Sequence, residues 1–146
     1  MTETMREMTV ADLQPILADH HRYWGERDMR AGHSFSLVRE FGRTCFVLEA
    51  DDGIRGYLIG WVSPDRVGYV HVIATRDDAR GAGVGRRLHE EFAKVAAGQG
   101  AVRLKAITST ANTGSVAFHT GIGFQAEVVE DYAGPGLPFV VFTREL

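Results

Sequence analysis

The stretch Arg80-Gly81-Ala82-Gly83-Val84-Gly85-Arg86 joins a strand-like apolar run, residues 69–75, to a helix-like run, residues 84–97. Three glycines at alternate positions leave the backbone bare where a helix begins, so several amide N–H groups can converge on an anion with the helix dipole behind them. Arg80 and Arg86 add positive charge. A plain strand-to-helix turn needs only one or two glycines, so the stretch predicts a phosphate-binding loop.

Other glycine-rich phosphate signatures do not fit these letters. A P-loop reads G-x-x-x-x-G-K-[ST], and no Lys-Ser or Lys-Thr pair comes after the glycines here. The dinucleotide signature G-x-G-x-x-G fails because Arg86 stands where its last glycine belongs. The pattern that remains is R-x-x-G-x-G.

A second block, Asn112-Thr113-Gly114-Ser115-Val116-Ala117-Phe118-His119 and then Gly123-Phe124, supports a specific interpretation. The two blocks together resemble the GNAT superfamily of N-acetyltransferases, whose acyl-CoA pyrophosphate loop reads Q/R-x-x-G-x-G/A and whose later helix commonly reads N-x-x-[AS]-x-x-[FL]-Y. The chain is most similar to an uncharacterised bacterial branch of that superfamily. The further matching positions are Trp24-Gly25, His71, Thr108-Ser109, Phe118-His119 and Asp131-Tyr132-Ala133-Gly134-Pro135-Gly136.

The composition is that of an ordinary globular chain. With 146 residues, 45% of them hydrophobic and 24% charged, a single domain spanning residues 1–146 is expected. A net charge of −3 argues against a nucleic-acid-binding face, so the anion site must be local. The single cysteine, Cys45, excludes an intrachain disulfide and suits a reducing cytoplasm. No secretory signal or membrane-spanning stretch is expected.

Apolar periodicity predicts an α/β sandwich around a mixed sheet, and the resemblance implies a mostly antiparallel one. Thr9 and Asp12 predict a capping box before a helix over residues 10–20. Pro15 falls inside that stretch, so either the helix is kinked there or it begins later than residue 10. Strands are expected over residues 4–8, 44–50, 55–63, 68–75, 102–108, 125–132 and 139–144. Further helices are expected over residues 34–41, with Phe35, Val38 and Phe41 on one stripe, and over residues 84–98 and 113–120.

The resemblance implies acetyl-CoA as the cofactor. Its pantetheine arm would lie along the strand over residues 68–75, and its pyrophosphate would lie on the amides of residues 82–86. The alternative for Asn112 is a helix N-cap. The implied cofactor-binding residues are Ile73, Thr75, Arg80, Gly81, Ala82, Gly83, Val84, Gly85, Arg86, Asn112 and Ser115.

His71 is the candidate general base. Many relatives carry a Glu on this strand, which here has no carboxylate, and an imidazole with an ordinary pKa near 6.5 can accept a proton close to neutral pH. Strand alternation places Tyr69, His71, Ile73 and Thr75 on one face, and Val70, Val72 and Ala74 on the other. A histidine that is merely hydrogen-bonded to a neighbour is an equal alternative.

His119 departs from the family pattern, in which a Tyr protonates the departing thiolate. Helical spacing places Asn112, Ser115 and His119 on one face, so a protonated imidazole could take over that role. The alternative is a packing histidine, with water or Tyr132 supplying the proton.

The acceptor pocket carries weaker signals. Trp24, Arg27, Phe35 and Trp61 could wall it, and Asp131 with Tyr132 could receive a cationic amine, although aromatic residues are more often core. No metal is expected, because His20, His21 and His33 lack ligand spacing.

The resemblance implies direct transfer of acetyl from acetyl-CoA to a primary amine, without a covalent enzyme intermediate. The acceptor could be a polyamine-like or amino-acid metabolite, an aminoglycoside-type antibiotic, or a protein N-terminus or lysine. The alternative is a catalytically silent acyl-CoA-binding sensor, suggested by the missing phenol and carboxylate. Homodimers are common in the family, and the sequence does not decide this point.

Overall fold

The computed structural model describes residues 2–146 and contains one seven-stranded sheet. The strand order is β1-β2-β3-β4-β5-β7-β6, with β4 and β5 parallel and every other neighbouring pair antiparallel. The predicted mixed, mostly antiparallel sheet is therefore confirmed. The strands are β1 (Thr4–Glu7), β2 (Phe46–Ala50), β3 (Gly53–Val62), β4 (Val67–Thr75), β5 (Arg103–Thr108), β6 (Gln125–Val129) and β7 (Phe139–Glu145).

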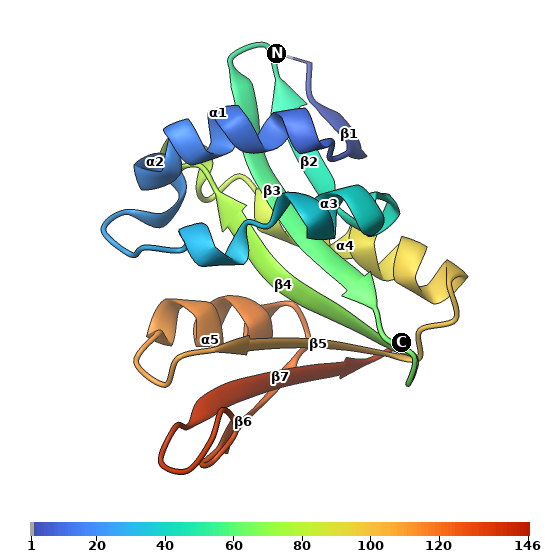
Figure 1. The fold of residues 1–146 in the computed structure, drawn as a ribbon, viewed down its shortest axis with the longest axis vertical. Helices are drawn as coiled ribbons and strands as arrows, with labels where there is room; N and C mark the ends of the chain where they lie inside the picture. Colours follow the sequence, from blue (N-terminus) through green and yellow to red (C-terminus); the bar gives the residue numbers. More distant parts are fainter. Residues whose placement is uncertain (1) are drawn as a thin grey trace.

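Helices cover both faces of the sheet (Figure 1). One face carries α1 (Leu13–Ala18), α2 (His20–Trp24) and α3 (Phe35–Glu40), and the other carries α4 (Val84–Gly98), while α5 (Thr113–Gly121) comes after β5. Short 3-10 turns lie at Val10–Asp12, Arg30–Gly32, Gly42–Thr44 and Asp77–Ala79. None of the helices described for residues 2–146 is long and apolar enough to span a bilayer.

The predicted single helix over residues 10–20 is wrong in its continuity. The chain forms the turn Val10–Asp12, then α1, then α2, and it breaks at Asp19, whose φ of −101° and ψ of 23° are not helical. Of the two alternatives for Pro15, the later helix start is the one observed: α1 begins at Leu13, so Pro15 lies in its first turn, where a missing N–H leaves no helical bond unmade. The Asp12 carboxylate does accept a hydrogen bond from the Thr9 amide at 2.8 Å, as expected for a capping box.

Two hydrophobic clusters pack against the two faces of the sheet. Leu88 and Phe92 of α4 are fully buried against one face, and burial of each such side chain contributes about 1.5–3 kcal/mol. The other cluster packs α1–α3 onto β2, β3 and β4 through Ile16 and Val38. The predicted stripe on α3 is wrong at its ends, since Phe35 is 67% exposed and Phe41 is 41% exposed. Phe41 lies just after the end of α3, and its ring contacts that of Trp61 in β3 with centroids 5.7 Å apart.

Two features of β4 shape the site: a bulge at His71, and the separation of β4 from β5 beyond Tyr69. Ile59 lies opposite Val72 and Gly60 opposite Val70, so His71 has no residue opposite it. Strands β4 and β5 pair only through residues 67–69 and 103–105, which leaves the edge of β4 beyond Tyr69 without a strand partner.

The bulge also overturns the predicted alternation along β4. Val70 belongs to the cluster beneath α4, and Ile73 packs against that same cluster. Val72 and Ala74 belong instead to the cluster beneath α1–α3. An extra residue inverts the faces of every residue after it, because side chains alternate with a period of two.

Candidate functional site

A single cavity of about 1090 Å³ gathers most of the predicted site residues. It is lined by the separated parts of β4 and β5, the start of α4, the α5 helix and a segment that begins at the end of α2. The predicted residues that line it are Trp24, Arg27, His71, Ile73, Thr75, Arg80, Gly81, Gly83, Val84, Gly85, Arg86, Asn112, Ser115 and His119. Ala82, Asp131 and Tyr132 are not among its lining residues.

The loop over residues 80–86 lines this cavity with every residue except Ala82. Gly81 and Gly83 take positive φ angles of 81° and 78°, and Gly83 is the N-cap of α4. Within residues 2–146, none of the seven amide N–H groups from Arg80 to Arg86 has a hydrogen-bond acceptor, and the first bond onto the loop is donated by Arg87 to the Gly83 carbonyl. Amides left unpaired at the start of a helix form an anion-binding site.

Gly85 has a different role from the other two glycines. A Cβ built there would lie 2.9 Å from the Phe118 ring, so the absent side chain allows α4 and α5 to approach closely. The Asn112 side chain accepts a hydrogen bond from the Ser115 amide at 3.1 Å and donates one to the Thr108 hydroxyl at 3.0 Å. Asn112 is therefore the N-cap of α5. A contact between Asn112 and the cofactor stays a prediction.

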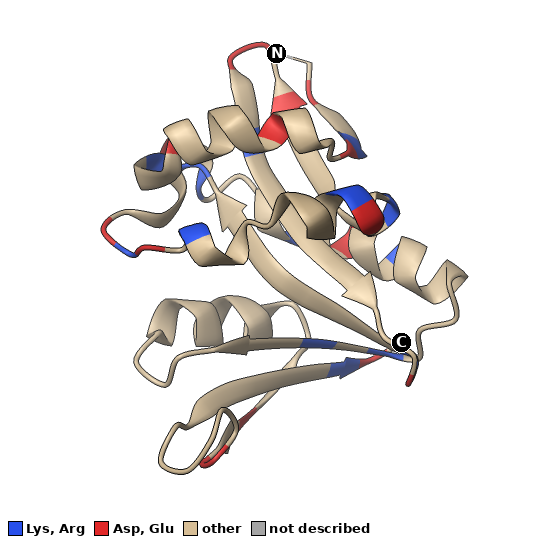
Figure 2. Cartoon of the chain, in the orientation of Figure 1, with Lys and Arg blue, Asp and Glu red and all other residues tan. Residues whose placement is uncertain are grey.

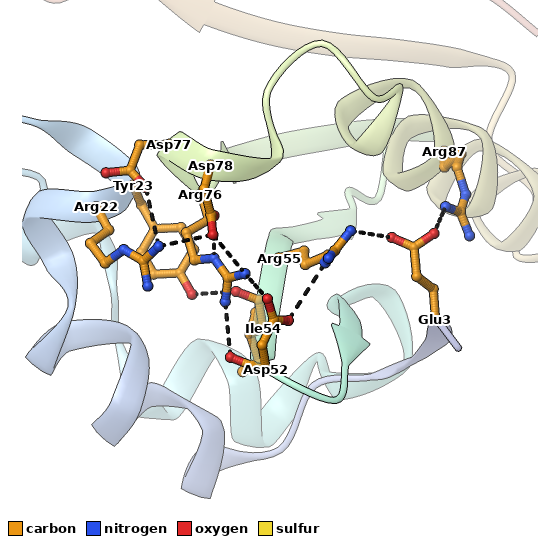
Figure 3. A network of polar contacts seen from close by, with 10 residues as sticks. All are labelled: Glu3, Arg22, Tyr23, Asp52, Ile54, Arg55, Arg76, Asp77, Asp78 and Arg87. Carbon is orange, nitrogen blue, oxygen red and sulfur yellow. Dashed lines mark hydrogen bonds and ion pairs between the residues drawn. The ribbon is translucent and has the colours of Figure 1, made fainter. Parts of the chain in front are cut away.

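A charge network holds the chain just before the loop (Figure 3). The guanidinium of Arg76, whose side chain is 4% exposed, lies 2.8 Å from the Asp52 carboxylate and 2.6 Å from that of Asp78. Arg76 lowers the pKa of both carboxyls, and Arg22 adds ion pairs to Asp77 and Asp78. Hydrogen bonds to two carboxylates fix the turn Asp77–Ala79, from which Arg80 continues.

Arg80 ties the loop to the opposite wall. Its guanidinium donates a hydrogen bond to the Tyr23 carbonyl at 3.2 Å, so α2 and the loop are held side by side. Arg86 is exposed at the first turn of α4.

His71 lies at the bulge, with its ring centroid 5.2 Å from that of Trp61 and 5.9 Å from that of Tyr69. Burial lowers its pKa, and a hydrogen bond with the Gly32 backbone opposes that shift. A histidine with a lowered pKa is neutral near pH 7, which is the protonation state that a general base needs.

His119 is arranged as a packed histidine. It is 4% exposed and stacks on Phe142 with ring centroids 4.2 Å apart. Its Nδ1 lies 2.8 Å from the Ser115 carbonyl oxygen, and since that oxygen only accepts, Nδ1 carries the proton. Nε2 has no partner, and burial lowers the pKa. The ring therefore has no spare N–H to offer a thiolate, which favours the packing alternative.

Asp131 and Tyr132 lie in the connection between β6 and β7. The Asp131 carboxylate accepts a hydrogen bond from the Gly136 amide at 2.8 Å. The Tyr132 ring lies 5.3 Å from the Lys105 ammonium and 6.0 Å from the Phe139 ring. The structure does not bring this pair together with the other predicted site residues.

A hydrogen-bond chain that sequence reasoning missed supports the segment after α2. The Trp24 indole donates to the Tyr57 hydroxyl at 2.7 Å, that hydroxyl lies 2.6 Å from His33 Nε2, and His33 Nδ1 lies 2.6 Å from the Met29 carbonyl. The carbonyl only accepts, so Nδ1 is protonated and Nε2 accepts from Tyr57. Burial lowers the pKa of His33, which keeps this arrangement near neutral pH.

Known proteins share this architecture. A profile described as "Acetyltransferase (GNAT) family" matches residues 6–124. The chain belongs to the GNAT acetyltransferase family. Ard1 from Thermoplasma volcanium is 18% identical with a TM-score of 0.80, and the match covers 100% of this chain and 99% of that one. The ribosomal-protein-alanine N-acetyltransferase from Brucella melitensis is 22% identical with a TM-score of 0.72, covering 98% and 99%.

A third similar structure is that of the NatC complex bound to Gag peptide and CoA, at 12% identity and a TM-score of 0.78, covering 100% of this GNAT chain and 99% of the other. Enzymes of the family use acetyl-CoA. The seven unpaired amides of residues 80–86 fit a diphosphate, and the unpaired edge of β4 fits an amide-containing arm. Within residues 2–146 no cluster of three or more potential metal ligands is found.

Proposed function

We propose that this GNAT protein transfers acetyl from acetyl-CoA directly to a primary amine. The observation that carries the proposal is the row of unpaired amides at residues 80–86, because every residue of that loop except Ala82 lines the same cavity as His71. An anion site and a neutral imidazole on one cavity are the two parts that such a transfer needs.

The proposed acetyl-CoA-binding residues lie on β4, on the loop before α4 and on α5. The loop amides would hold the pyrophosphate, with charge from Arg80 and Arg86. Ile73 and Thr75 lie on the part of β4 that has no neighbouring β5 strand, so their backbone groups on that edge are free to bind the pantetheine arm. Ser115 and Asn112 line the cavity from α5.

Bound acetyl-CoA supplies the acetyl group as a thioester. The amine nitrogen bonds to the carbonyl carbon, the carbon–sulfur bond breaks, and His71 takes the proton that the nitrogen releases, directly or through water. No covalent enzyme intermediate is needed. Cys45 is fully buried, does not line the cavity and has its pKa raised to about 11 by burial, so it is unsuited to act as a nucleophile.

The departing sulfur does not require a dedicated acid. A thiol has a pKa of about 8.5, so its thiolate is a weak base that water can protonate. This step is consistent with a His119 whose protonated Nδ1 donates its hydrogen bond to the Ser115 carbonyl.

The test measures thiol release with a panel of primary amines, comparing His71→Ala with the exposed-histidine control His21→Ala. We expect kcat to fall about 100-fold or more in His71→Ala, with unchanged affinity for acetyl-CoA by calorimetry. Unchanged turnover would remove His71 as the base. Binding of acetyl-CoA without turnover of any amine would favour the sensor alternative.

The pH profile provides a second readout. The pKa of His71 is lowered by burial, so its basic form persists below pH 6.5 and activity should be lost only as the pH falls further. The acidic limb of kcat/KM should therefore have a midpoint below 6.5.

A further inference from the structure

The cavity is lined by cations and no anions. None of its lining residues is Asp or Glu, and neither β4 nor α5 carries an acidic residue (Figure 2). Its charged lining residues are Arg27, Arg80 and Arg86, beside the imidazoles His71 and His119. A polycationic acceptor entering this cavity would lose hydration without meeting a carboxylate, which is unfavourable.

Of the three arginines that line the cavity, Arg27 is the one outside the proposed pyrophosphate-binding loop. It lies on the segment after α2, with its guanidinium 5.9 Å from the centroid of the Trp24 ring. Among the ion pairs within residues 2–146, none involves Arg27. The neighbouring Glu26 and Asp28 do not line the cavity but line a smaller hollow, which Arg27 also borders. Asp28 pairs there with Arg30 at 3.1 Å.

The same region offers an apolar wall. Trp24, Met29, Tyr69 and Phe139 line the cavity together with His71. The chain through Trp24, Tyr57 and His33 holds that wall in place, so it is formed before an acceptor arrives.

We propose that the acceptor is an amine that also carries a carboxylate and an apolar or aromatic side chain, as an apolar amino acid does. Arg27 binds the carboxylate, the Trp24 and Met29 side chains receive the apolar group, and the amine faces His71. The positive cavity also disfavours the ammonium form of the bound amine, which eases its deprotonation. This inference rests on the proposed function.

The first experiment measures kcat/KM by thiol release for L-phenylalanine and L-leucine, their amides, and spermidine. We expect each acid to exceed its amide by about tenfold or more, and spermidine to be the poorest acceptor. Arg27→Gln should abolish the preference for the acids and leave the KM for acetyl-CoA unchanged. Arg30→Gln, a change in the same exposed segment, should preserve the preference.

The second experiment does not depend on turnover. Calorimetry with CoA present compares N-acetyl-L-phenylalanine with its amide, and the acid should bind at least about tenfold more tightly in the wild type but not in Arg27→Gln. Equal or better use of amides or spermidine would overturn the acceptor class while leaving acetyl transfer intact. A raised KM for acetyl-CoA with every acceptor in Arg27→Gln would assign Arg27 to the cofactor and overturn the proposal.

The two failures are separable. Tight binding of the N-acetylated acid without turnover would support this ligand class and overturn the transfer reaction. Absence of both turnover and binding would overturn both.

Discussion

Two glycine-rich loops of this protein have similar letters and opposite hydrogen bonding. The loop over residues 80–86 and the loop over residues 131–137 each contain two glycines with positive φ. In the first loop the amides have no acceptor within residues 2–146. In the second, the Gly134 amide donates to the Asp131 carbonyl, the Gly136 amide to the Asp131 carboxylate, and the Leu137 amide to the Gly134 carbonyl.

The difference lies in the element that each loop enters. The first leads into the 15-residue helix α4, whose starting amides cannot be satisfied within the helix. The second leads into β7 and closes on itself. Glycines therefore indicate flexibility of φ in both loops, but only unpaired donors at a helix start indicate an anion site.

The largest expected effect comes from replacing the two positive-φ glycines of each loop by valine, one loop at a time. Valine at positive φ costs about 1–2 kcal/mol per residue, so the double variant Gly81→Val/Gly83→Val should weaken acetyl-CoA binding roughly 30-fold or more. Gly134→Val/Gly136→Val should lower the free energy of unfolding to a similar extent but leave that affinity unchanged. Calorimetry and urea unfolding of both variants check this. Equal loss of affinity in the two would erase the functional difference between the loops.

The pH dependence of the free energy of unfolding tests the packing of α4, the helix that follows the first loop. His89 of α4 is 1% exposed, both of its ring nitrogens lack partners, and burial, with His119 and Arg144 nearby, lowers its pKa to about 3. The folded pKa lies below the unfolded value, so the unfolded chain binds more protons below pH 6.5. The contribution of neutral His89 to the free energy of unfolding should be fully present above pH 6.5 and should fall by about 1.4 kcal/mol per pH unit towards pH 3.

The variant His89→Phe should flatten this dependence in urea unfolding at pH 7.5 and pH 5, whereas His21→Phe should not. His119 contributes in the same direction, because burial lowers its pKa as well. A dependence that persists in full in His89→Phe would refute the assignment.

An intermediate effect is expected at the support of the first loop. Arg76→Met preserves volume but removes the bonds to Asp52 and Asp78, so the free energy of unfolding should fall by about 2 kcal/mol. Affinity for acetyl-CoA should fall with it, since Asp77–Ala79 precedes the loop directly. Arg103→Met breaks an exposed ion pair with Glu145 and should change stability by less than about 1 kcal/mol. Unaltered cofactor affinity in Arg76→Met would show that the loop holds its shape unaided.

The smallest effect is expected in the second loop. Asp131→Ala removes the acceptor of the Gly136 amide and should lower the free energy of unfolding by about 1 kcal/mol. The KM values for amine and cofactor should not change, because Asp131 does not line the cavity. Steady-state kinetics checks this. A marked rise in the KM for the amine would show that Asp131 does take part in acceptor binding.

Local patterns predicted most of the fold and part of the site. The strands β2 and β3, the helix α4 and the loop before it depend on neighbours in sequence, and all were found close to their predicted residue ranges. The bulge at His71, the burial of Arg76 between Asp52 and Asp78, and the His33 chain were missed. Each joins residues from different elements, so periodicity within one segment contains no signal for it.

The sequence by itself determined the family, the order of strands and helices, and the glycine-bearing turn at the head of α4, because these depend on short-range backbone preferences and on hydrophobic spacing. Only the tertiary structure decided that β4 and β5 part beyond Tyr69, that His119 packs against Phe142, and that Asp131 stays outside the cavity. These outcomes depend on which side chains meet across the sheet, and such meetings are set by the burial of the whole chain rather than by any one stretch of it.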